Sequence, residues 1–170
     1  TGLSSAVGAA DLSEQSLVAA LRTTSGIPRH NIYIVDGHGE RRVTDLREDG
    51  LGIGFMAQGL KDSGYRVEQL PLYRIERIPD DAHLLIFAGS TAEFPTQEEA
   101  IVQNWLARGG KGLFMLDAYP GPTSSIARIL AKWGVDVVEG EIVDKQRSAA
   151  GDHRTLVVQS DQYPGGTAIT

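Results

Sequence analysis

The sequence predicts an α/β fold, a doubly wound and mostly parallel sheet in the flavodoxin-like strand order 2-1-3-4-5. Short apolar runs alternate with segments of helical periodicity across residues 31–138. Several of these runs stop at glycine or aspartate, as buried parallel strands do at their carboxyl ends. With 170 residues, the chain is long enough for one domain with its own core.

The amino-terminal part is predicted to be a disordered lead of residues 1–10, a helix over 11–26 and a strand over 31–35. Asp11 and Glu14 have the spacing of a capping box, which marks the start of a helix. The strand is β-branched and aromatic, and the sequence Asp-Gly follows it.

The next predicted elements are a helix over 50–62, a strand over 65–70 and a strand over 83–88. The helix has four apolar residues at the spacing i, i+3, i+4 and i+7, which are Ile53, Met56, Ala57 and Leu60. The second of the two strands is almost wholly apolar, which is typical of a central position in a parallel sheet. Phe55 and Leu51 lie off the apolar face of the helix, where they are available for a contact surface.

The second half continues with a helix that starts at a Thr96 and Glu99 capping box and stops at Gly109-Gly110. A strand over 112–116 follows, then a helix that opens at Pro122 and stops at Gly134, and a fifth strand over 135–138. Each of the two helices has a tryptophan on its apolar face, which predicts that Trp105 and Trp133 are core residues.

After residue 138 the periodicity is lost. Residues 141–143 and 155–159 are predicted as extended segments joined by a polar loop over 144–154, which form either an antiparallel edge of the sheet or the opening of a part that was cut away. We therefore expect one domain over 11–170, with its core at 31–138 and a C-terminal edge at 139–170. The chain has neither an initial Met nor a leader, so we interpret it as a fragment of a longer protein.

Composition excludes several classes of function. The formal net charge is −6 with no basic block, which argues against nucleic acid and anionic membrane surfaces as partners. The absence of cysteine excludes thiolate zinc sites and cysteine nucleophiles. No apolar run approaches the about 20 residues of a membrane span. No cofactor is predicted.

The candidate site lies where the order of a parallel sheet reverses, beyond the carboxyl ends of the strands. The loops after the first, third and fourth strands supply polar residues and glycines to this edge. The predicted ligand-binding residues are Asp36, Gly37, His38, Gly39, Glu40, Gly89, Ser90, Thr91, Asp117 and Tyr119.

Simpler interpretations of the same residues stay open. Gly37 and Gly39 can serve turn geometry alone, with His38 exposed and Asp36 capping loop amides. A metal site built from Asp36, His38, Glu40 and Asp117 is a further alternative. The dinucleotide-binding fingerprint fails, because its third glycine position holds an arginine.

Ser90 is the candidate nucleophile, because a sharp turn after a central strand presents a reactive oxygen in a nucleophile elbow. The local sequence Ala88-Gly89-Ser90-Thr91-Ala92 lacks the second glycine of that motif. No helix opens directly after it, which weakens the hydrolase interpretation.

Several motifs, in register over about residues 11–165, resemble one family. The strand and loop from Ile32 to Glu40 carry Gly-His-Gly-Glu, and further matches follow in order along the chain. These matches are Gly64-Tyr65, Ile78 to Ala82, Ala88-Gly89, Glu98-Glu99, Trp105-Leu106, Gly109-Gly110, Leu116-Asp117, Trp133 to Val135 and Gly151-Asp152. The chain resembles the soluble domain of auxiliary proteins of uncharacterised ABC-type transport systems, the gliding-motility-type group.

The resemblance implies a domain similar to class I glutamine-amidotransferase-like folds, held on the extracytoplasmic (periplasmic) side by membrane segments outside this fragment. It implies an ABC transporter permease or other membrane components as partners. Amidotransferases of that fold use a cysteine after a central strand, where this chain has Ser90, so their chemistry does not carry over. The family also resembles a domain of eukaryotic intraflagellar-transport proteins that serves assembly.

We therefore expect a binding or assembly domain of an ABC transport system that is not an enzyme. The alternative is a hydrolase-like enzyme on a small polar substrate, with His38 as general base and Asp36 or Glu40 orienting it. If the site binds a small molecule, the three carboxylates around it favour a neutral polar ligand such as a saccharide.

Overall fold

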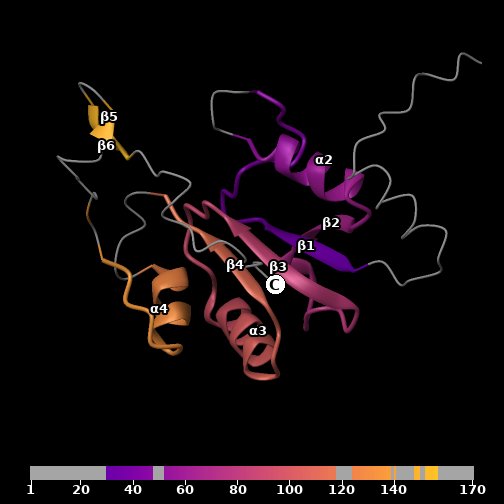
Figure 1. The fold of residues 1–170 in the computed structure, drawn as a ribbon. Helices are drawn as coiled ribbons and strands as arrows, with labels where there is room; N and C mark the ends of the chain where they lie inside the picture. Colours follow the sequence, from indigo (N-terminus) through magenta and orange to yellow (C-terminus); the bar gives the residue numbers. More distant parts are fainter. Residues whose placement is uncertain are drawn as a thin grey trace, which may run out of the picture.

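The chain forms a four-stranded sheet in which every strand is parallel to its neighbours (Figure 1). The structure is a computed structural model that describes residues 30–47, 52–117, 124–138, 140, 148–149 and 152–156. The strands are β1 (Asn31–Asp36), β2 (Arg66–Pro71), β3 (Ala82–Ala88) and β4 (Gly112–Met115). Their order in the sheet is β2-β1-β3-β4, so the α/β class is confirmed together with the first four positions of the predicted order.

β1 lies inside the sheet, with β2 on one side and β3 on the other. In register, Ile34 stands opposite Gln69 of β2 and Ile86 of β3. The chain enters β2 on one side of β1 and then crosses to β3 on the other side. The strand order therefore reverses between β1 and β3, as expected from the sequence.

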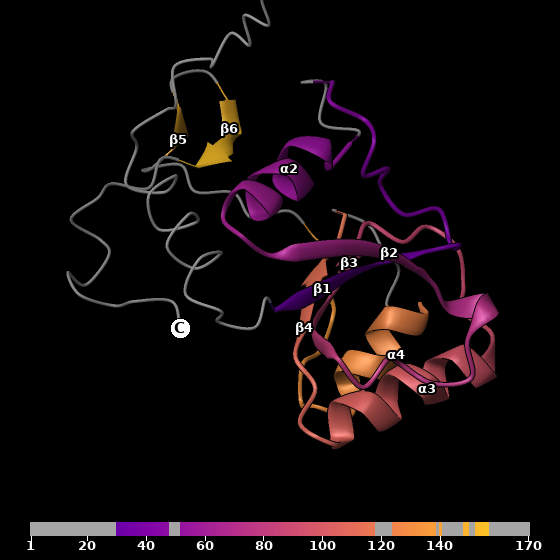
Figure 2. The ribbon, with the colours of Figure 1, turned by 90° about the vertical axis from the view of Figure 1, so that its right-hand side faces the viewer.

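Helices cover both faces of the sheet (Figure 2). α2 (Gly54–Asp62) lies on one face, and α3 (Thr96–Ala107) and α4 (Ser125–Ala131) lie on the other. A single 3-10 turn, η1 (Leu72–Arg74), follows β2 and inserts Leu72 fully into the interior. The sheet and the helices on its two faces form three layers, with one hydrophobic core on each face of the sheet.

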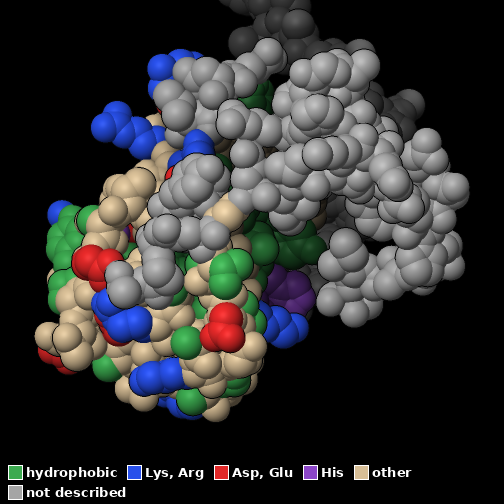
Figure 3. All heavy atoms as spheres, turned by 90° about the vertical axis from the view of Figure 1, so that its left-hand side faces the viewer, with side chains coloured by type: hydrophobic (Ala, Val, Ile, Leu, Met, Phe, Trp, Pro, Cys, Tyr) green, Lys and Arg blue, Asp and Glu red, His purple; other side chains and the backbone are tan. Residues whose placement is uncertain are grey.

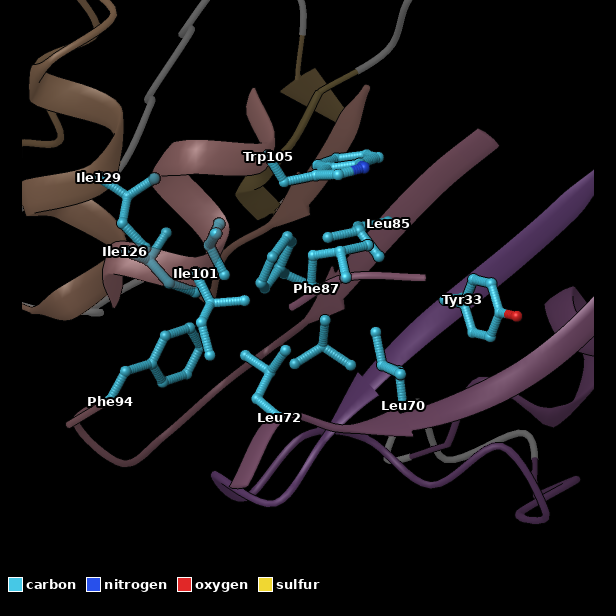
Figure 4. Close-up of a cluster of buried hydrophobic side chains, with 13 residues drawn as sticks. Tyr33, Leu70, Leu72, Leu85, Phe87, Phe94, Ile101, Trp105, Ile126 and Ile129 are labelled. Atoms are coloured by element: carbon cyan, nitrogen blue, oxygen red, sulfur yellow. The ribbon is translucent and has the colours of Figure 1, made fainter. Parts of the chain in front are cut away.

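Alternation along β1 separates the two cores. Ile32 and Ile34 face α2 and pack with Ile53 and Ala57, whereas Tyr33 and Val35 face α3 and α4. Figure 4 shows the larger core, in which Phe87 lies among side chains from the sheet and both helices. The labelled members of that core are Tyr33, Leu70, Leu72, Leu85, Phe87, Phe94, Ile101, Trp105, Ile126 and Ile129.

The predicted capping box of α3 is wrong. The helix begins at Thr96 after Pro95, and the Pro95 carbonyl accepts the N–H groups of Glu98 and Glu99. The Glu99 carboxylate instead pairs with Arg128 of α4. The Glu99 side chain, which local spacing assigned to the cap, therefore bonds to a residue of another helix instead.

Two other helices start later than expected. α2 begins at Gly54 rather than Gly50, because the Ile53 N–H donates to the Arg42 carbonyl at 3.1 Å and ties that residue to the preceding loop. α4 begins at Ser125, where the Ser124 hydroxyl accepts from the Ala127 N–H at 3.2 Å. Gly50 and Pro122 lie outside the described residues, as does the predicted helix over 11–26.

The predicted fifth strand over 135–138 is wrong, and so is the core position of Trp133. Gly134 turns the chain with φ +76°, and the Val135 N–H donates to the Leu130 carbonyl as part of the helix end. Val135 and Val138 are 49% and 78% exposed and pair with no described strand. Trp133 comes after the last helical turn and is 53% exposed, whereas Trp105 is buried as predicted.

The C-terminal edge is a separate antiparallel pair in the described residues. β5 (Ser148–Ala149) pairs with β6 (Asp152–Leu156), so the two strands lie mostly within the stretch 144–154 that was predicted to be a loop. The residues of this segment therefore pair with one another, Ser148 opposite Leu156 and Ala149 opposite Asp152. Residues 141–143 and 157–159 lie outside the described residues.

The outer side of α4 carries adjoining basic and acidic side chains (Figure 3). Arg128 pairs with Glu93 at 2.8 Å and with Glu99, which connects α4 to the start of α3. A hydrogen bond from Ser125, together with the pairing with Arg128, holds the pKa of Glu93 below its ordinary value. None of the helices in the described part of the chain has the length and apolarity of a membrane span.

Phe87→Ala tests the larger core. Phe87 is fully buried and stacks on Phe114 with ring centroids 4.5 Å apart, so its loss should lower the free energy of unfolding by about 3–5 kcal/mol. Phe55→Ala is the matched control, because Phe55 is 59% exposed and its loss should change stability by less than about 0.5 kcal/mol. Equal effects of the two variants in urea unfolding would contradict this packing.

Candidate functional site

The loops after β1, β3 and β4 meet at the carboxyl edge of the sheet. The Arg41 N–H donates to the Ala88 carbonyl at 2.8 Å, and the Gly89 N–H donates to the Met115 carbonyl at 2.9 Å. The Thr91 N–H donates to the His38 carbonyl, also at 2.9 Å. These backbone bonds bring together residues from three separate loops, as the sequence predicted.

A polar group that we call the His38 cluster consists of three buried side chains, His38, Glu40 and Glu98, and the half-buried Ser90. His38, Glu40 and Glu98 are only 7–8% exposed. One oxygen of Glu40 accepts the His38 N–H at 2.7 Å, and the other accepts the Ser90 hydroxyl at 2.8 Å. Glu40, rather than Asp36, is therefore the carboxylate that caps the loop amide.

The His38 ring lies between two carboxylates. Its Nε2 is 3.0 Å from Glu98 Oε2, and its Nδ1 is 3.7 Å from Glu40 Oε1. The Glu98 contact has the distance of an ion pair but not the alignment of a hydrogen bond, and Nδ1 has no hydrogen-bond partner among the described residues. Phe94 packs on the ring with centroids 4.3 Å apart. The interpretation of His38 as an exposed residue is therefore wrong.

Gly39 and Gly89 permit the close approach of the loops. Gly39 has φ +79°, and a Cβ there would lie 2.1 Å from Thr91 Oγ1. Gly89 has φ +65°, and a Cβ there would lie 3.0 Å from Asp117 Oδ2. Both residues therefore meet a conformational and a steric requirement of their turns, which one interpretation of the sequence had given for Gly39.

A cleft of about 300 Å³ opens beside the His38 cluster. Its lining comes from the loop after β1 and from the first residues after β3 and β4. The lining residues are Gly39, Glu40, Arg41, Arg42, Asp45, Arg47, Gly89, Thr91 and Asp117. Five of the predicted site residues, Gly39, Glu40, Gly89, Thr91 and Asp117, are thus brought to one cleft.

The other predicted residues have different positions. His38 and Ser90 belong to the His38 cluster beside the cleft. Asp36 is exposed at the end of β1, opposite Pro71 of β2, and Gly37 packs against Tyr73; neither lines the cleft. Tyr119 lies outside the described residues.

Charges in the cleft are mostly arranged in pairs. Arg41 contacts Asp117 at 2.6 Å, and Arg47 contacts Asp45 at 2.6 Å. Hydrogen bonds from Arg47, with the positive charges of Arg47 and Arg42, lower the pKa of Asp45 to about 2. Each of the two aspartates that line the opening is therefore the partner of an arginine.

The described residues do not favour the metal or nucleophile alternatives. No group of three or more His, Asp or Glu side chains within the described ranges is placed to hold a metal ion, so the four residues proposed from the sequence are not gathered there. The Ser90 hydroxyl donates to Glu40 rather than to a histidine. A serine nucleophile needs a general base within hydrogen-bond reach, and here the acceptor is a carboxylate that also caps a loop amide.

Sequence reasoning missed Glu98 and the three arginines of the cleft. Glu98 is in the first turn of α3, where an acidic residue normally faces solvent and the helix dipole, so its burial against His38 had no local signal. Arg41, Arg42 and Arg47 did carry a signal, because three basic residues fall within seven positions of an acidic chain. Their place directly after the Gly-His-Gly-Glu motif was available from the sequence.

One family model matches the chain. It is described as ABC-type uncharacterized transport system, and the match covers residues 29–163, which include all four strands of the sheet and the cleft. No curated protein and no solved structure matches the chain.

A double-mutant cycle tests the His38 cluster. Glu98→Leu leaves His38 buried without its charged partner and should lower the free energy of unfolding by about 3 kcal/mol. The double variant with His38→Leu should be less destabilised than the sum of the two single variants, by at least about 1 kcal/mol. Glu76→Leu, at an exposed position, is the control and should change stability by less than about 0.5 kcal/mol. Additive effects in urea unfolding would show that the two side chains do not interact.

The Asp45 carboxyl reports on the arginines of the cleft. Its pKa is lowered from the ordinary value of 3.8 to about 2. The pairing with Arg47 should therefore be complete above pH 3.8 and weaken only as the pH falls toward 2. In Arg47→Gln, an NMR titration of the Asp45 carboxyl carbon should show the pKa raised toward 3.8. A midpoint that stays near 2 in this variant would exclude Arg47 as the main cause.

Proposed function

Because the chain belongs to the ABC-type uncharacterized transport system family, as an auxiliary component of such a system, we propose that it is a non-catalytic binding or assembly domain on the extracytoplasmic side of the membrane. Its partners are then the permease or other membrane components of the same transporter. The family match supports the transport context, and the geometry of the cleft supports binding.

One observation carries the proposal against catalysis. His38, the histidine nearest the cleft among the described residues, is 7% exposed, lies under Phe94 and stands between Glu40 and Glu98. A general base must come within hydrogen-bond reach of the proton that it removes. His38 in this position supports the loop and the start of α3 instead of meeting a substrate.

The cleft supports a binding role in two ways. It is concave and open, and its lining combines glycine backbone with charged side chains, the kind of polar groups that orient a small ligand. It also lies at the reversal of strand order, where ligands bind in open parallel sheets.

The enzymatic alternative has a direct test. Hydrolase and glutamine amidotransferase screens on the purified chain should give no turnover above background, and Ser90→Ala should leave this result unchanged. Robust turnover that Ser90→Ala abolishes would defeat the non-catalytic proposal.

Location and partnership can be measured in cells, because the chain contains no cysteine. A single cysteine introduced at Phe55, which is 59% exposed on α2, should react with a membrane-impermeant maleimide in intact cells. The same cysteine placed at the buried Ala57 is the matched control and should stay unlabelled. Labelling only after lysis would contradict the extracytoplasmic location.

The same cells test the transporter partnership. Crosslinking from the Phe55→Cys position, followed by mass spectrometry, should recover permease or ATPase subunits of an ABC system. Recovery of the full-length protein without any such subunit, from Phe55→Cys and from a second exposed position such as Tyr73→Cys, would contradict it.

A further inference from the structure

Three arginines face one cleft in a chain whose formal net charge is −6. Arg41, Arg42 and Arg47 all come from the loop between β1 and α2. Asp45 and Asp117 lie in the same lining, while the third acid, Glu40, has both oxygens engaged by His38 and Ser90. The lining therefore holds three arginines and three acidic side chains, and of these acids Glu40 is the buried one.

Arg42 differs from the other two arginines. Arg41 is paired with Asp117, and Arg47 is paired with Asp45. The Arg42 side chain is exposed and makes no hydrogen bond or ion pair with the described part of the chain. Its guanidinium has five N–H donors in a planar fork that matches the oxygens of a carboxylate or a phosphate.

The backbone that presents Arg42 is held in place. Its carbonyl accepts the N–H groups of Asp45 at 3.3 Å and Ile53 at 3.1 Å, and it forms a β-bridge with Gly52. A Cβ on Gly52 would lie 2.4 Å from the Asp45 carbonyl oxygen, so this approach is close enough to require glycine. Fixing the loop before the ligand arrives reduces the entropy lost on binding.

We propose that this cleft binds an oxyanion, the carboxylate or phosphate group of a small molecule, with Arg42 as the group that pairs with it. This assignment rests on the proposed binding function and names its ligand class. Arg41 and Arg47 are already paired with Asp117 and Asp45, which leaves Arg42 as the arginine of the lining without a partner among the described residues. The Gly39 backbone, which makes no hydrogen bond within the described residues, lies beside the same opening.

The neutral saccharide predicted from the sequence rested on repulsion between an anion and three carboxylates. In the structure Asp36 does not line the cleft, Glu40 is buried, and Asp117 is neutralised by Arg41. Hydrogen bonds from Arg47 lower the pKa of Asp45 to about 2, so this carboxylate too is held by an arginine. A comparison of a charged sugar with its neutral counterpart distinguishes the two ligand classes.

The experiment is an NMR titration of the ¹⁵N-labelled chain with three probes: glucuronate, glucose and inorganic phosphate. Glucuronate, phosphate or both should shift the amide signals of Gly39, Arg42 and Gly89 in a saturable way that weakens with added salt, and glucose should not. Which of the two anions binds more tightly tells carboxylate from phosphate. Arg42→Gln should weaken anion binding at least about tenfold, and Arg42→Lys should weaken it less, because it retains the charge but loses the fork.

Arg77→Gln is the matched control. Arg77 is an exposed arginine paired with Asp80 before the amino end of β3, at the opposite edge of the sheet, and its loss should leave the titration unchanged. Equal binding of glucose and glucuronate would overturn the oxyanion assignment while leaving a binding cleft. Unchanged affinity in Arg42→Gln, or no shift with either anion, would also overturn it. The crosslinking result reports on the transporter partnership independently, so the two failures are distinguishable.

Discussion

The burial of β1 on both faces is the constraint on which the rest of the structure depends. Ile32 and Ile34 build the core under α2, and Tyr33 and Val35 build the core under α3 and α4. The same strand forms the hydrogen-bonded ladders to β2 and β3, so its register positions both neighbours. Because β1 ends at Asp36, the loop that follows it must leave the sheet at the point where the strand order reverses. The location of the cleft is a consequence of that packing.

The His38 cluster extends this constraint from the sheet to the loops. Burying charged groups costs free energy unless they are paired, and here one imidazole, two carboxylates and a hydroxyl satisfy most of one another's polar atoms. Such a cluster adds little net stability, but an incorrect loop position would leave a buried carboxylate without a partner. It therefore specifies how the loop after β1 sits against Ser90 and α3. The position of this loop in turn sets where the arginines that follow in the chain lie.

Two layers of polar residues follow from this arrangement, with different roles. The inner layer consists of the buried His38, Glu40 and Glu98 and the half-buried Ser90, and most of its contacts are internal. The outer layer of arginines and aspartates is open to solvent and lines a cleft. A doubly wound fold hosts many unrelated functions, so its presence alone says little about activity. The separation of a mostly buried inner layer from an open outer layer favours binding over catalysis, in keeping with membership of a transport-system family.

Local pattern was sufficient for the four parallel strands, their order and the apolar faces of α2 and α3, because burial on one or two faces imposes a period that is visible in sequence. It was also sufficient to place Gly39, Glu40, Gly89, Thr91 and Asp117 at one edge, since parallel strands end together. It failed at Val135–Val138 and Trp133, where apolar residues have the right spacing but no described neighbour to pack on.

The contents of the site were decided by tertiary structure. Glu99 spacing indicates a helix cap, yet its carboxylate bonds to Arg128, 29 positions away. Glu98 looks like an exposed first-turn acid, yet it is buried against His38 from another loop. The sequence by itself determined the sheet, the edge where the loops meet and the family. Contacts between distant segments decide which carboxylates are buried and which are paired with arginines, and these contacts have no period in the sequence.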